Sequence, residues 1–235
     1  MESYPEKLSH FYLLYPNFGM EKTMKYKHII WDWNGTLLDD RWLCVEGINE
    51  SLKKRSLPTI TEEIYKKVFS FPVEDYYKRL GFDFDEEPFE VAGDEFVKYY
   101  GKSFHETKLH EGASSVIKDI SIAGFSQSIL SAGKQEYLNE WVKSHELQDY
   151  FIIIRGIDNQ YARGKIELGI TFMNELPYDN HEVIMIGDTV HDSEVADAMG
   201  IDCLLLDHGH MGKERLQKTG RKVLSSMSQI LDIID

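Results

Sequence analysis

The strongest constraint on the fold of this 235-residue chain is a series of short apolar runs, most of them separated by helical patterns. The first run, KHIIWDWNG from Lys27, is stopped by Asn-Gly, which is typical of a buried strand that ends in a turn. Similar runs follow at 125–131, 150–154, 181–187 and 201–206. Helical patterns occur among these later runs at 134–146, 164–176 and 190–199. Strands that alternate with helices predict an α/β fold with a doubly wound parallel sheet, which binds ligands at the carboxyl ends of its strands.

The stretch between the first and second runs has a different character. Residues 41–106 are rich in Leu, Tyr, Phe, Lys and Glu at helical spacing, and no strand pattern interrupts them. Helices are expected at 41–55, 61–70, 73–80 and 88–105. An all-helical insertion directly after the first strand predicts a cap domain over the site, with aromatic side chains that mainly form the cap's own core. The catalytic core is then 25–40 and 107–235, and residues 1–24 form an N-terminal extension.

Composition excludes several classes of partner. A net charge of −14 argues against nucleic acid and anionic membranes. No stretch reaches the ~20 apolar residues of a membrane span, and the N-terminus lacks the pattern of a signal peptide. Cys44 and Cys203 have no metal-ligand spacing and are expected as buried free thiols. These features predict a cytoplasmic protein, a monomer or homodimer.

Chemically useful side chains cluster where the expected strands end and helices begin. The first strand is followed by Asp32-Trp33-Asn34-Gly35-Thr36, and the second ends at Ser131-Ala132. Lys165 opens a later helix, and the fourth strand leads into Asp188, with Asp192 one helical turn beyond. Because the carboxyl ends of parallel strands meet at one edge of the sheet, all four groups are expected to converge on one pocket.

These four groups, in this order, resemble the haloacid dehalogenase superfamily, and specifically its phosphoglycolate phosphatase-like branch with a helical cap of the C1 type. The resemblance runs from Lys25 to the C-terminus and implies a Rossmannoid core. It also implies that Asp32 is the nucleophile of a phosphatase and becomes an aspartyl-phosphate. The expected substrate is a small phosphorylated metabolite, hydrolysed as a phosphomonoester.

The resemblance further implies Mg²⁺ as the cofactor. Its ligands are expected to be Asp32, the backbone carbonyl of Asn34 and Asp188, while Asp192 orients metal-bound water or a lysine. Phosphate binding is expected from Ser131, Lys165 and the amides that begin at Ala132. The logic is physical as well, because a carboxylate can attack a phosphoryl group only where positive charge masks their repulsion.

Asn34 departs from the family pattern, in which a second aspartate protonates the leaving oxygen and activates water. A carboxamide cannot exchange a proton usefully near neutral pH. Three interpretations stay open. The substrate has a good leaving group, such as an acyl or aryl phosphate; another group, such as Asp39, Asp40 or a cap residue, supplies the proton; or the chain binds a phosphorylated ligand with little turnover.

Two other activities of the family are weaker alternatives. A haloacid dehalogenase needs no Mg²⁺ and has no use for the Asp188/Asp192 pair. A phosphonate hydrolase needs a cap lysine for a Schiff base, and Lys53 and Lys54 instead fit a solvated helix face.

Several remaining residues are assigned simpler roles. His208 and His210, in Asp-His-Gly-His, are expected in a surface turn, and His191 is expected to be exposed. Arg41 and Lys78 in the cap, together with Arg155 after the third strand, are the candidates for contacting a carboxylate or second phosphate of the substrate.

Overall fold

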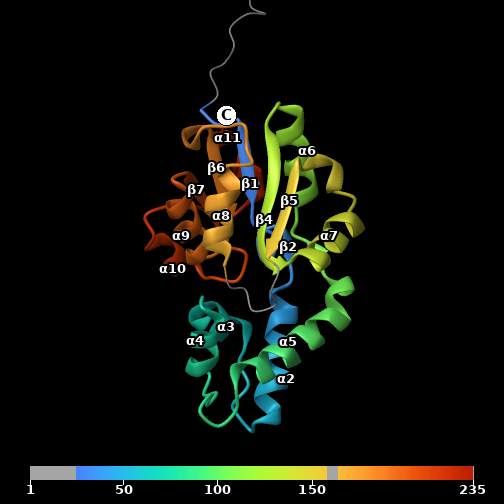
Figure 1. The fold of residues 1–235 in the computed structure, drawn as a ribbon, viewed down its shortest axis with the longest axis vertical. Coiled ribbons are helices and arrows are strands. Elements are labelled where there is room, and N and C mark those ends of the chain that lie inside the picture. Colours follow the sequence, from blue (N-terminus) through green and yellow to red (C-terminus); the bar gives the residue numbers. More distant parts are fainter. Residues whose placement is uncertain (1–24, 158–163, 235) are drawn as a thin grey trace, which may run out of the picture.

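The computed structural model describes residues 25–157 and 164–234, and a parallel sheet forms its centre (Figure 1). Its strands are β1 (His28–Trp31), β4 (Ser126–Lys134), β5 (Ile153–Ile157), β6 (Val183–Gly187), β7 (Asp202–Leu206) and β8 (Lys222–Leu224). They lie in the order β5-β4-β1-β6-β7-β8, and all neighbouring pairs are parallel. The predicted doubly wound α/β fold is confirmed. The predicted extension at 1–24 lies outside the described residues.

Helices cover both faces of this sheet. Figure 1 shows α8 (Lys165–Met173), α9 (Val190–Met199) and α10 (Lys213–Gln217) on one side, and α6 (Ala113–Ile122) and α7 (Gln135–Ser144) on the other. Side chains of β1 alternate between two hydrophobic clusters: Ile29 and Trp31 face one, and Ile30 faces the other. Because the side chains of a strand alternate at period two and both faces are buried, the strand reads as a continuous apolar run.

Strand boundaries differ from expectation at three places. Residues 148–150 form a 3-10 turn, so β5 begins at Ile153 and Arg155 lies within it rather than after it. β4 continues past Ser131 to Lys134, with a register shift against β5 between Leu130 and Lys134. The last strand, β8, was not expected; it is only three residues long. The remaining short elements are η1 (Phe104–Glu106), η2 (Gln148–Tyr150), η3 (Asn180–Glu182), η4 (Met227–Gln229) and α11 (Leu231–Ile234).

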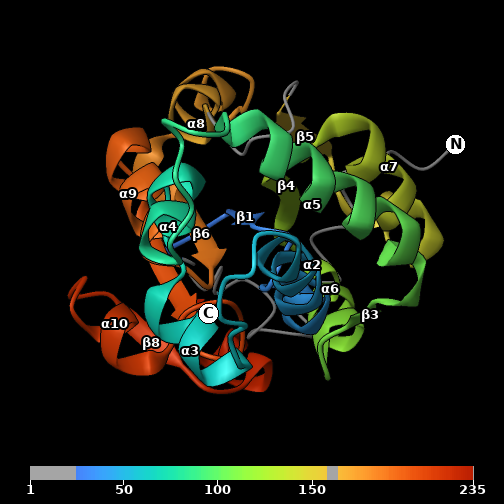
Figure 2. The same cartoon turned by 90° about the horizontal axis from the view of Figure 1, so that it is seen from below.

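The insertion after β1 is helical, as predicted. It contains α2 (Arg41–Lys54), α3 (Glu62–Val68), α4 (Val73–Arg79) and α5 (Phe89–Ser103). These helices lie together beyond one end of the sheet (Figures 1 and 2). The chain enters them through β2 (Leu38–Asp39) and leaves through β3 (Lys108–Leu109), which pair antiparallel. A short ribbon therefore joins the insertion to the sheet, and neither of its strands was evident from the sequence.

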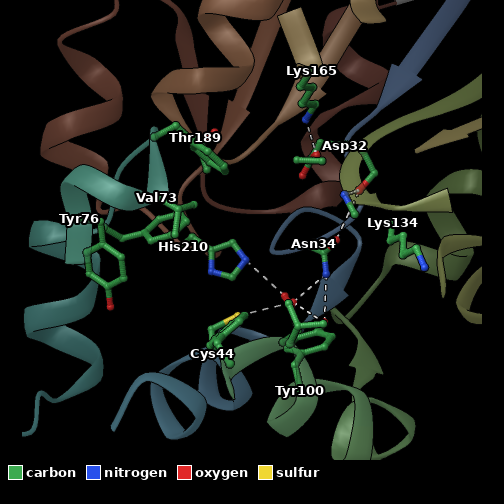
Figure 3. Close-up of a pocket in the computed structure, with 18 of the residues that line it drawn as sticks. Asp32, Asn34, Cys44, Val73, Tyr76, Tyr100, Lys134, Lys165, Thr189 and His210 are labelled. Atoms are coloured by element: carbon green, nitrogen blue, oxygen red, sulfur yellow. Dashed lines mark hydrogen bonds and ion pairs between the residues drawn. The ribbon is translucent and has the colours of Figure 1, made fainter. Parts of the chain in front are cut away.

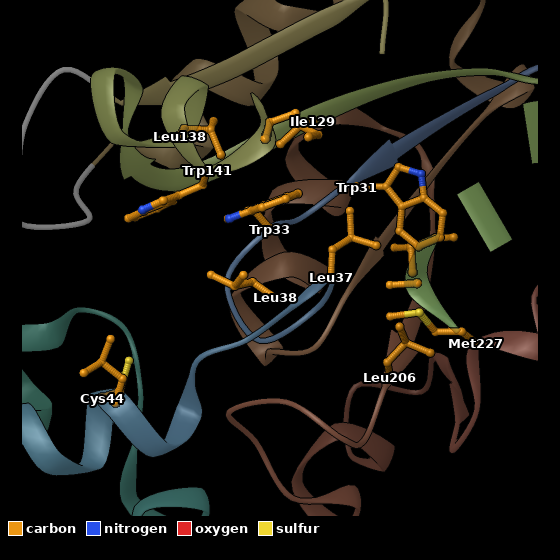
Figure 4. Close-up of a cluster of buried hydrophobic side chains, with 14 of the residues drawn as sticks. Trp31, Trp33, Leu37, Leu38, Cys44, Ile129, Leu138, Trp141, Leu206 and Met227 are labelled. Carbon is orange, nitrogen blue, oxygen red and sulfur yellow. The ribbon is translucent and has the colours of Figure 1, made fainter. Parts of the chain in front are cut away.

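A hydrophobic cluster continues from the sheet into the loop after β1. Trp31, Trp33 and Leu37 are fully buried, and Leu38 joins them on the way to the helical insertion (Figure 4). Trp33 follows Asp32 directly, so its burial anchors the backbone that carries the carboxylate. Cys44 and Cys203 are buried free thiols, as predicted. No helix in the described part of the chain is long and apolar enough to cross a membrane.

Candidate active site

Asp32 is positioned by the end of β1 and by the tight turn that follows. Its backbone N–H donates to the Ile186 carbonyl at 2.9 Å, which extends the pairing of β1 with β6 by one residue. The amides of Leu37 and Leu38 both donate to the carbonyl of Trp33 at 3.0 Å and close the turn. The Asp32 side chain is therefore fixed at the carboxyl end of the central strand.

Gly35 gives this turn its shape. Its φ is +79°, and a Cβ at this position would lie 2.3 Å from the His210 ring and 2.5 Å from a carboxylate oxygen of Asp188. Only glycine adopts such a conformation readily and leaves room for both neighbours. The turn after β1 therefore packs directly against the two later loops that carry Asp188 and His210.

Lys165 joins two buried carboxylates. Its ammonium lies 2.5 Å from Oδ1 of Asp32 and 2.6 Å from Oδ1 of Asp192, and all three residues are at most 5% exposed. Burial alone would lower the pKa of Lys165, but the charges of Asp192 and Asp32 raise it above its usual value. Lys165 is therefore a fixed cation beside Asp32 (Figure 3).

Asp192 is fully engaged by hydrogen bonds. Its Oδ2 accepts from the amides of Asp188 and Thr189 at 3.1 and 2.9 Å and from the Thr189 hydroxyl at 2.7 Å. The Asp192 amide in turn donates to the Thr189 hydroxyl oxygen at 3.2 Å, which completes a capping box at the start of α9. This geometry fits the expectation that Asp192 orients Lys165, and it also holds the Asp188 loop in place.

Asp188 lies opposite Asp32. It accepts from the Thr36 hydroxyl at 2.8 Å and from the His210 amide at 2.6 Å. Oxygens of Asp32, Asp188 and Asp192 all lie within 4.8 Å of one another. Burial, with the charges of Asp192 and Asp188, raises the pKa of Asp32 to about 8 despite Lys165. A positive charge close to these three carboxylates favours their ionised forms.

The donor set fits Mg²⁺. Mg²⁺ prefers oxygen ligands, often one or two carboxylates with retained waters. Asp32 and Asp188 supply such oxygens, and among the described residues nothing donates a hydrogen bond to the backbone carbonyl of Asn34. These are the three groups expected from the sequence to hold the ion.

Ser131 is fully buried in β4, two residues beyond Ile129, which pairs with Trp31 of β1, and it lines the same cavity as Asp32. Its hydroxyl accepts from the Gly133 amide at 2.9 Å and contacts Oδ1 of Asn34 at 3.4 Å. Ala132, Gly133 and Lys134 continue the strand, and α7 begins at Gln135 with Lys134 as its N-cap, one residue after the expected start at 134. The register shift against β5 spans Ser131 and Ala132, and such irregularities re-aim side chains near active sites.

The Asn34 amide has a fixed orientation. Its Nδ2 donates to Oδ2 of Asp40 at 2.8 Å and to the Tyr100 hydroxyl at 3.0 Å, and Oδ1 faces Ser131. The Tyr100 hydroxyl also donates to Asp40 at 2.7 Å. Since the Asp40 carboxylate only accepts, the NH₂ group must point toward it. Asn34 therefore presents a carbonyl oxygen to the site and holds its hydrogens away from it (Figure 3).

His210 contradicts the expected surface turn. It is 5% exposed, and its ring lies 3.3 Å from Asp40 and 3.0 Å from the Tyr65 hydroxyl. Burial alone would lower the pKa of His210, but the charge of Asp40 and its hydrogen bond raise it to about 9. His208 is half-buried, with its ring against the Thr36 carbonyl. Both histidines follow the carboxyl end of β7, so the strand-end argument that found Asp188 could have found them too.

Asp40 is ionised and surrounded by donors. Besides Asn34, Tyr100 and His210, the Gly35 amide donates to it at 2.9 Å. Burial alone would raise the pKa of Asp40, but the charge and hydrogen bond of His210 hold it below its usual value. A carboxylate in this state is a poor proton donor. Asp39, the other acidic candidate, is half-buried in β2.

The cations expected to meet a second anionic group are all held elsewhere. Arg41 bonds Glu62 at 2.8 Å and the carbonyls of His208 and Gly209. Lys78 is exposed beside Glu74 and Asp75 on its own helix, and Arg155 pairs with Glu175.

Two further sequence interpretations can be compared with the structure. Lys53 and Lys54 lie on a solvated face with Glu50 and Glu95, as expected. His191, expected to be exposed, is half-buried and stacks on Phe71 with 4.6 Å between ring centroids.

A cavity of about 190 Å³ lies between these residues and the helical insertion (Figure 3). Asp32, Asn34, Ser131, Ala132, Lys165 and Asp192 line its polar end. Its other walls are largely aromatic and aliphatic side chains: Ile48, Tyr65, Phe69, Phe71, Val73, Tyr76, Tyr77, Phe96, Val97, Tyr100, Tyr137 and Trp141. Many aromatic residues assigned to the interior of the insertion thus also face this cavity.

Comparison with known proteins finds one matching family and several similar proteins. The profile of the family described as Haloacid dehalogenase-like hydrolase matches residues 29–206. The tyrosine-protein kinase PtkA of Mycobacterium tuberculosis is 21% identical over 203 residues, which cover 86% of this chain and 69% of that protein. A phosphoglycolate phosphatase of Vibrio parahaemolyticus is 20% identical, with 88% and 96% covered.

Solved structures agree on the fold. One, described as a predicted phosphatase from Clostridium acetobutylicum, superposes with a TM-score of 0.76 at 22% identity. The match covers 88% of this chain and 99% of that structure, so the similarity includes both the sheet and the helical insertion.

Proposed function

The chain belongs to the haloacid dehalogenase-like hydrolase family, and on that premise we propose that it is a Mg²⁺-dependent phosphatase of a small phosphomonoester. The observation that carries the proposal is the buried set of Asp32, Lys165, Asp188 and Ser131, brought together from four separate segments of the chain. A cation beside a buried carboxylate, at the end of a cavity, is the arrangement that phosphoryl transfer to a carboxylate requires.

In the proposed mechanism Asp32 is the nucleophile. One oxygen of its carboxylate forms a bond to phosphorus while the bond to the leaving oxygen breaks, which gives an aspartyl-phosphate. Lys165 and the Ser131 hydroxyl hold the phosphoryl oxygens. Mg²⁺, held by Asp32, Asp188 and the Asn34 carbonyl, would mask the repulsion between two anions. Asp192 keeps Lys165 in position through the 2.6 Å contact.

Asn34 affects the relative rates of the two steps, formation of the aspartyl-phosphate and its hydrolysis. Its hydrogens point to Asp40 and Tyr100, and an amide does not supply or remove a proton. Attack by water on the aspartyl-phosphate benefits from a base, and the loss of general acid–base help costs about 10²–10⁴ in rate. The aspartyl-phosphate is therefore expected to accumulate during turnover.

The relatives support phosphoryl chemistry more than any one substrate. One bears the name of a kinase and another the name of a phosphatase, at about one fifth identity to this chain. What these activities share is handling of a phosphoryl group, which is the part of the site formed by Asp32, Lys165 and Asp188.

Acetyl phosphate tests this proposal directly, because its leaving group needs no proton. With Mg²⁺ the purified protein should release inorganic phosphate, and EDTA or Asp32→Asn should abolish the release. Asp39→Asn, which changes a half-buried carboxylate outside the cavity, is the matched control and should retain turnover. Release that persists with EDTA, or in Asp32→Asn, would contradict the mechanism.

A phosphate-binding protein with little turnover is the second candidate, and Asn34 is the observation that favours it. This candidate predicts Mg²⁺-dependent binding of inorganic phosphate, measured by calorimetry, without hydrolysis of acetyl phosphate. Halide release from a haloacid that is unaffected by EDTA would instead indicate a dehalogenase.

A further inference from the structure

Resting on the proposed phosphatase activity, we infer that the substrate is an aryl phosphate, a phosphomonoester whose leaving group is an uncharged aromatic alcohol. Two independent features carry this inference. One is the composition of the cavity wall, and the other is the hydrogen bonding of the described side chains around Asn34.

The cavity wall is built for an apolar group. Beyond the polar end, α2, α4 and α5 contribute Ile48, Val73, Tyr77, Phe96 and Val97. Phe69 and Phe71 lie edge to face with their ring centroids 5.4 Å apart, at the boundary with α9. Aromatic side chains such as these two bind another ring by burying its surface and by edge-to-face or stacked contact. A cavity of about 190 Å³ has room for one or two rings.

The helical insertion offers no cation to this cavity. Among the described residues that line it, the basic ones are Lys134, Lys165 and His210, and all three belong to the sheet domain. Lys165 and His210 are committed to Asp32, Asp192 and Asp40, and Lys134 pairs with Glu136 at 2.8 Å. A substrate carboxylate placed against the wall formed by the insertion would thus meet aromatic and aliphatic side chains and no basic residue of the insertion, which is costly.

Two buried donors indicate what the ring carries. The Tyr76 hydroxyl and the Trp141 indole N–H have no hydrogen-bond partner among the described residues, and both residues line the cavity. Buried polar groups are rarely left unsatisfied. A neutral hydrogen-bonding substituent on the ring would satisfy one of them without introducing charge.

The proton donors near Asn34 select the same chemistry. The Asp40 carboxylate already accepts hydrogen bonds from the Asn34 amide, the Gly35 amide and the Tyr100 hydroxyl. The two ring nitrogens of His210 face Asp40 and Tyr65. A phenol ionises with a pKa of about 10, as tyrosine does, whereas the pKa of a simple alcohol, like that of water, is far higher. An aryl oxygen can therefore leave without the acid that this site lacks.

The reaction balances with water as the only co-reactant. Asp32 displaces the aryl oxyanion from phosphorus, and that oxyanion takes a proton from solvent. Water then attacks phosphorus and breaks the bond to the Asp32 oxygen. The products are a phenol and inorganic phosphate, and Asp32 is regenerated.

Three substrates separate the two features. Phenyl phosphate combines a ring with a good leaving group, benzyl phosphate has a ring on a poor leaving group, and phosphoglycolate has a carboxylate and no ring. With Mg²⁺, kcat/KM for phenyl phosphate should exceed the other two by about 100-fold. Benzyl phosphate should compete with phenyl phosphate, since it fits the wall, and phosphoglycolate should not.

A pair of variants on α5 tests the wall itself. Val97→Lys places a cation inside the cavity, whereas Val91→Lys makes the same change at an exposed position of that helix, away from the cavity. The ratio of phenyl phosphate to acetyl phosphate turnover should fall about tenfold in Val97→Lys and stay unchanged in Val91→Lys. Structural damage alone would lower both activities together.

The outcomes separate this inference from the proposed function. Turnover of acetyl phosphate, without preference for phenyl phosphate over phosphoglycolate, would overturn the aryl substrate and leave the phosphatase intact. If none of these compounds is turned over in the presence of Mg²⁺, both the aryl substrate and the phosphatase activity are refuted.

Discussion

At the scale of single residues, the pair of Asn34 and Asp40 decides how this site handles protons. The amide of Asn34 lies 2.8 Å from the Asp40 carboxylate, which also meets Tyr100, His210 and the Gly35 amide. An aspartate at position 34 alone would bring two carboxylates to hydrogen-bond distance, and one of them would have to stay protonated. Asparagine at position 34, in place of the family's aspartate, therefore fits its surroundings, because the Asp40 carboxylate accepts a hydrogen bond from this side chain.

Exchanging the two side chains should restore a general base. In the double variant Asn34→Asp/Asp40→Asn, a carboxylate faces the cavity and an amide still bonds it from position 40. Steady-state phosphate release should rise about 10²-fold, and the accumulated aspartyl-phosphate, measured by acid quench, should disappear.

The single variants give the controls for this exchange. The rate of phosphate release should rise less in Asn34→Asp, because the new carboxyl group would share a proton with Asp40. The rate should not rise in Asp40→Asn. An exchange variant that folds, binds phosphate with Mg²⁺ and is no faster than the parent would contradict the role assigned to Asn34.

At the scale of elements, the turn after β1 depends on close packing between three loops. Gly35 leaves room for Asp188 and His210, and the buried Trp33 anchors the same turn in the core. The three loops follow β1, β6 and β7, which are adjacent in the sheet. The topology of the sheet therefore supports the site directly.

Gly35→Ala should strongly destabilise the protein. The added Cβ would overlap two neighbours at a φ of +79°, and strain and overpacking of this kind cost about 2–4 kcal/mol. Gly212→Ala is the matched control, because its φ is −78° and nothing lies within 4 Å of the added atom. Urea unfolding of both variants measures the difference, and equal stabilities would refute the packing argument.

At the scale of the whole molecule, buried groups link stability to metal and pH. Asp32 and Asp188 come from segments about 150 residues apart, so a cation held between them stabilises only the folded state. A Mg²⁺ ion bound as proposed would therefore join the ends of β1 and β6 through these two carboxylates.

Metal removal should lower the melting temperature. At [Mg²⁺] of 100 times Kd the folded state gains about 2.7 kcal/mol, which corresponds to several degrees for a chain of this size. The shift between Mg²⁺ and EDTA, measured by thermal unfolding, should vanish in Asp188→Asn and persist in Asp119→Asn, which alters an exposed aspartate of α6. A shift that survives Asp188→Asn would place the ion elsewhere.

His28 makes stability sensitive to acid. Burial lowers the pKa of His28 from 6.5 to about 4 in the folded state. Between these two pH values His28 is protonated in the unfolded chain and neutral in the folded protein. The contribution of neutral His28 to the free energy of unfolding is therefore fully present above pH 6.5 and is lost as the pH falls toward 4. The loss should approach about 3 kcal/mol.

Urea unfolding at pH 7 and pH 4.5 tests the role of His28. In His28→Leu the difference between the two pH values should shrink by about 2–3 kcal/mol. His181→Leu, at an exposed position, should leave the difference unchanged. An undiminished difference in His28→Leu would assign the acid sensitivity to other groups.

The sequence by itself determined the α/β class, the helical insertion and the acidic and basic groups at the strand ends. These features are encoded locally, because periodicity and Gly or Pro breaks are set by neighbours along the chain, and parallel strands end at a common edge. The proximity of Asp32, Lys165, Asp188 and Asp192 could therefore be predicted from the sequence alone. The ribbon of β2 and β3 could not be, because each strand has only two residues.

Only the tertiary structure decided the surroundings of Asn34. His210 meets Asp40 across 170 residues and Tyr100 meets it across 60, so no local pattern marks either contact. The same holds for the cap cations, since Arg41 and Lys78 are as compatible with a substrate carboxylate in sequence as with the acidic neighbours that hold them. Side-chain direction and pairing depend on three-dimensional packing, and they are what makes the cavity wall formed by the insertion aromatic and uncharged.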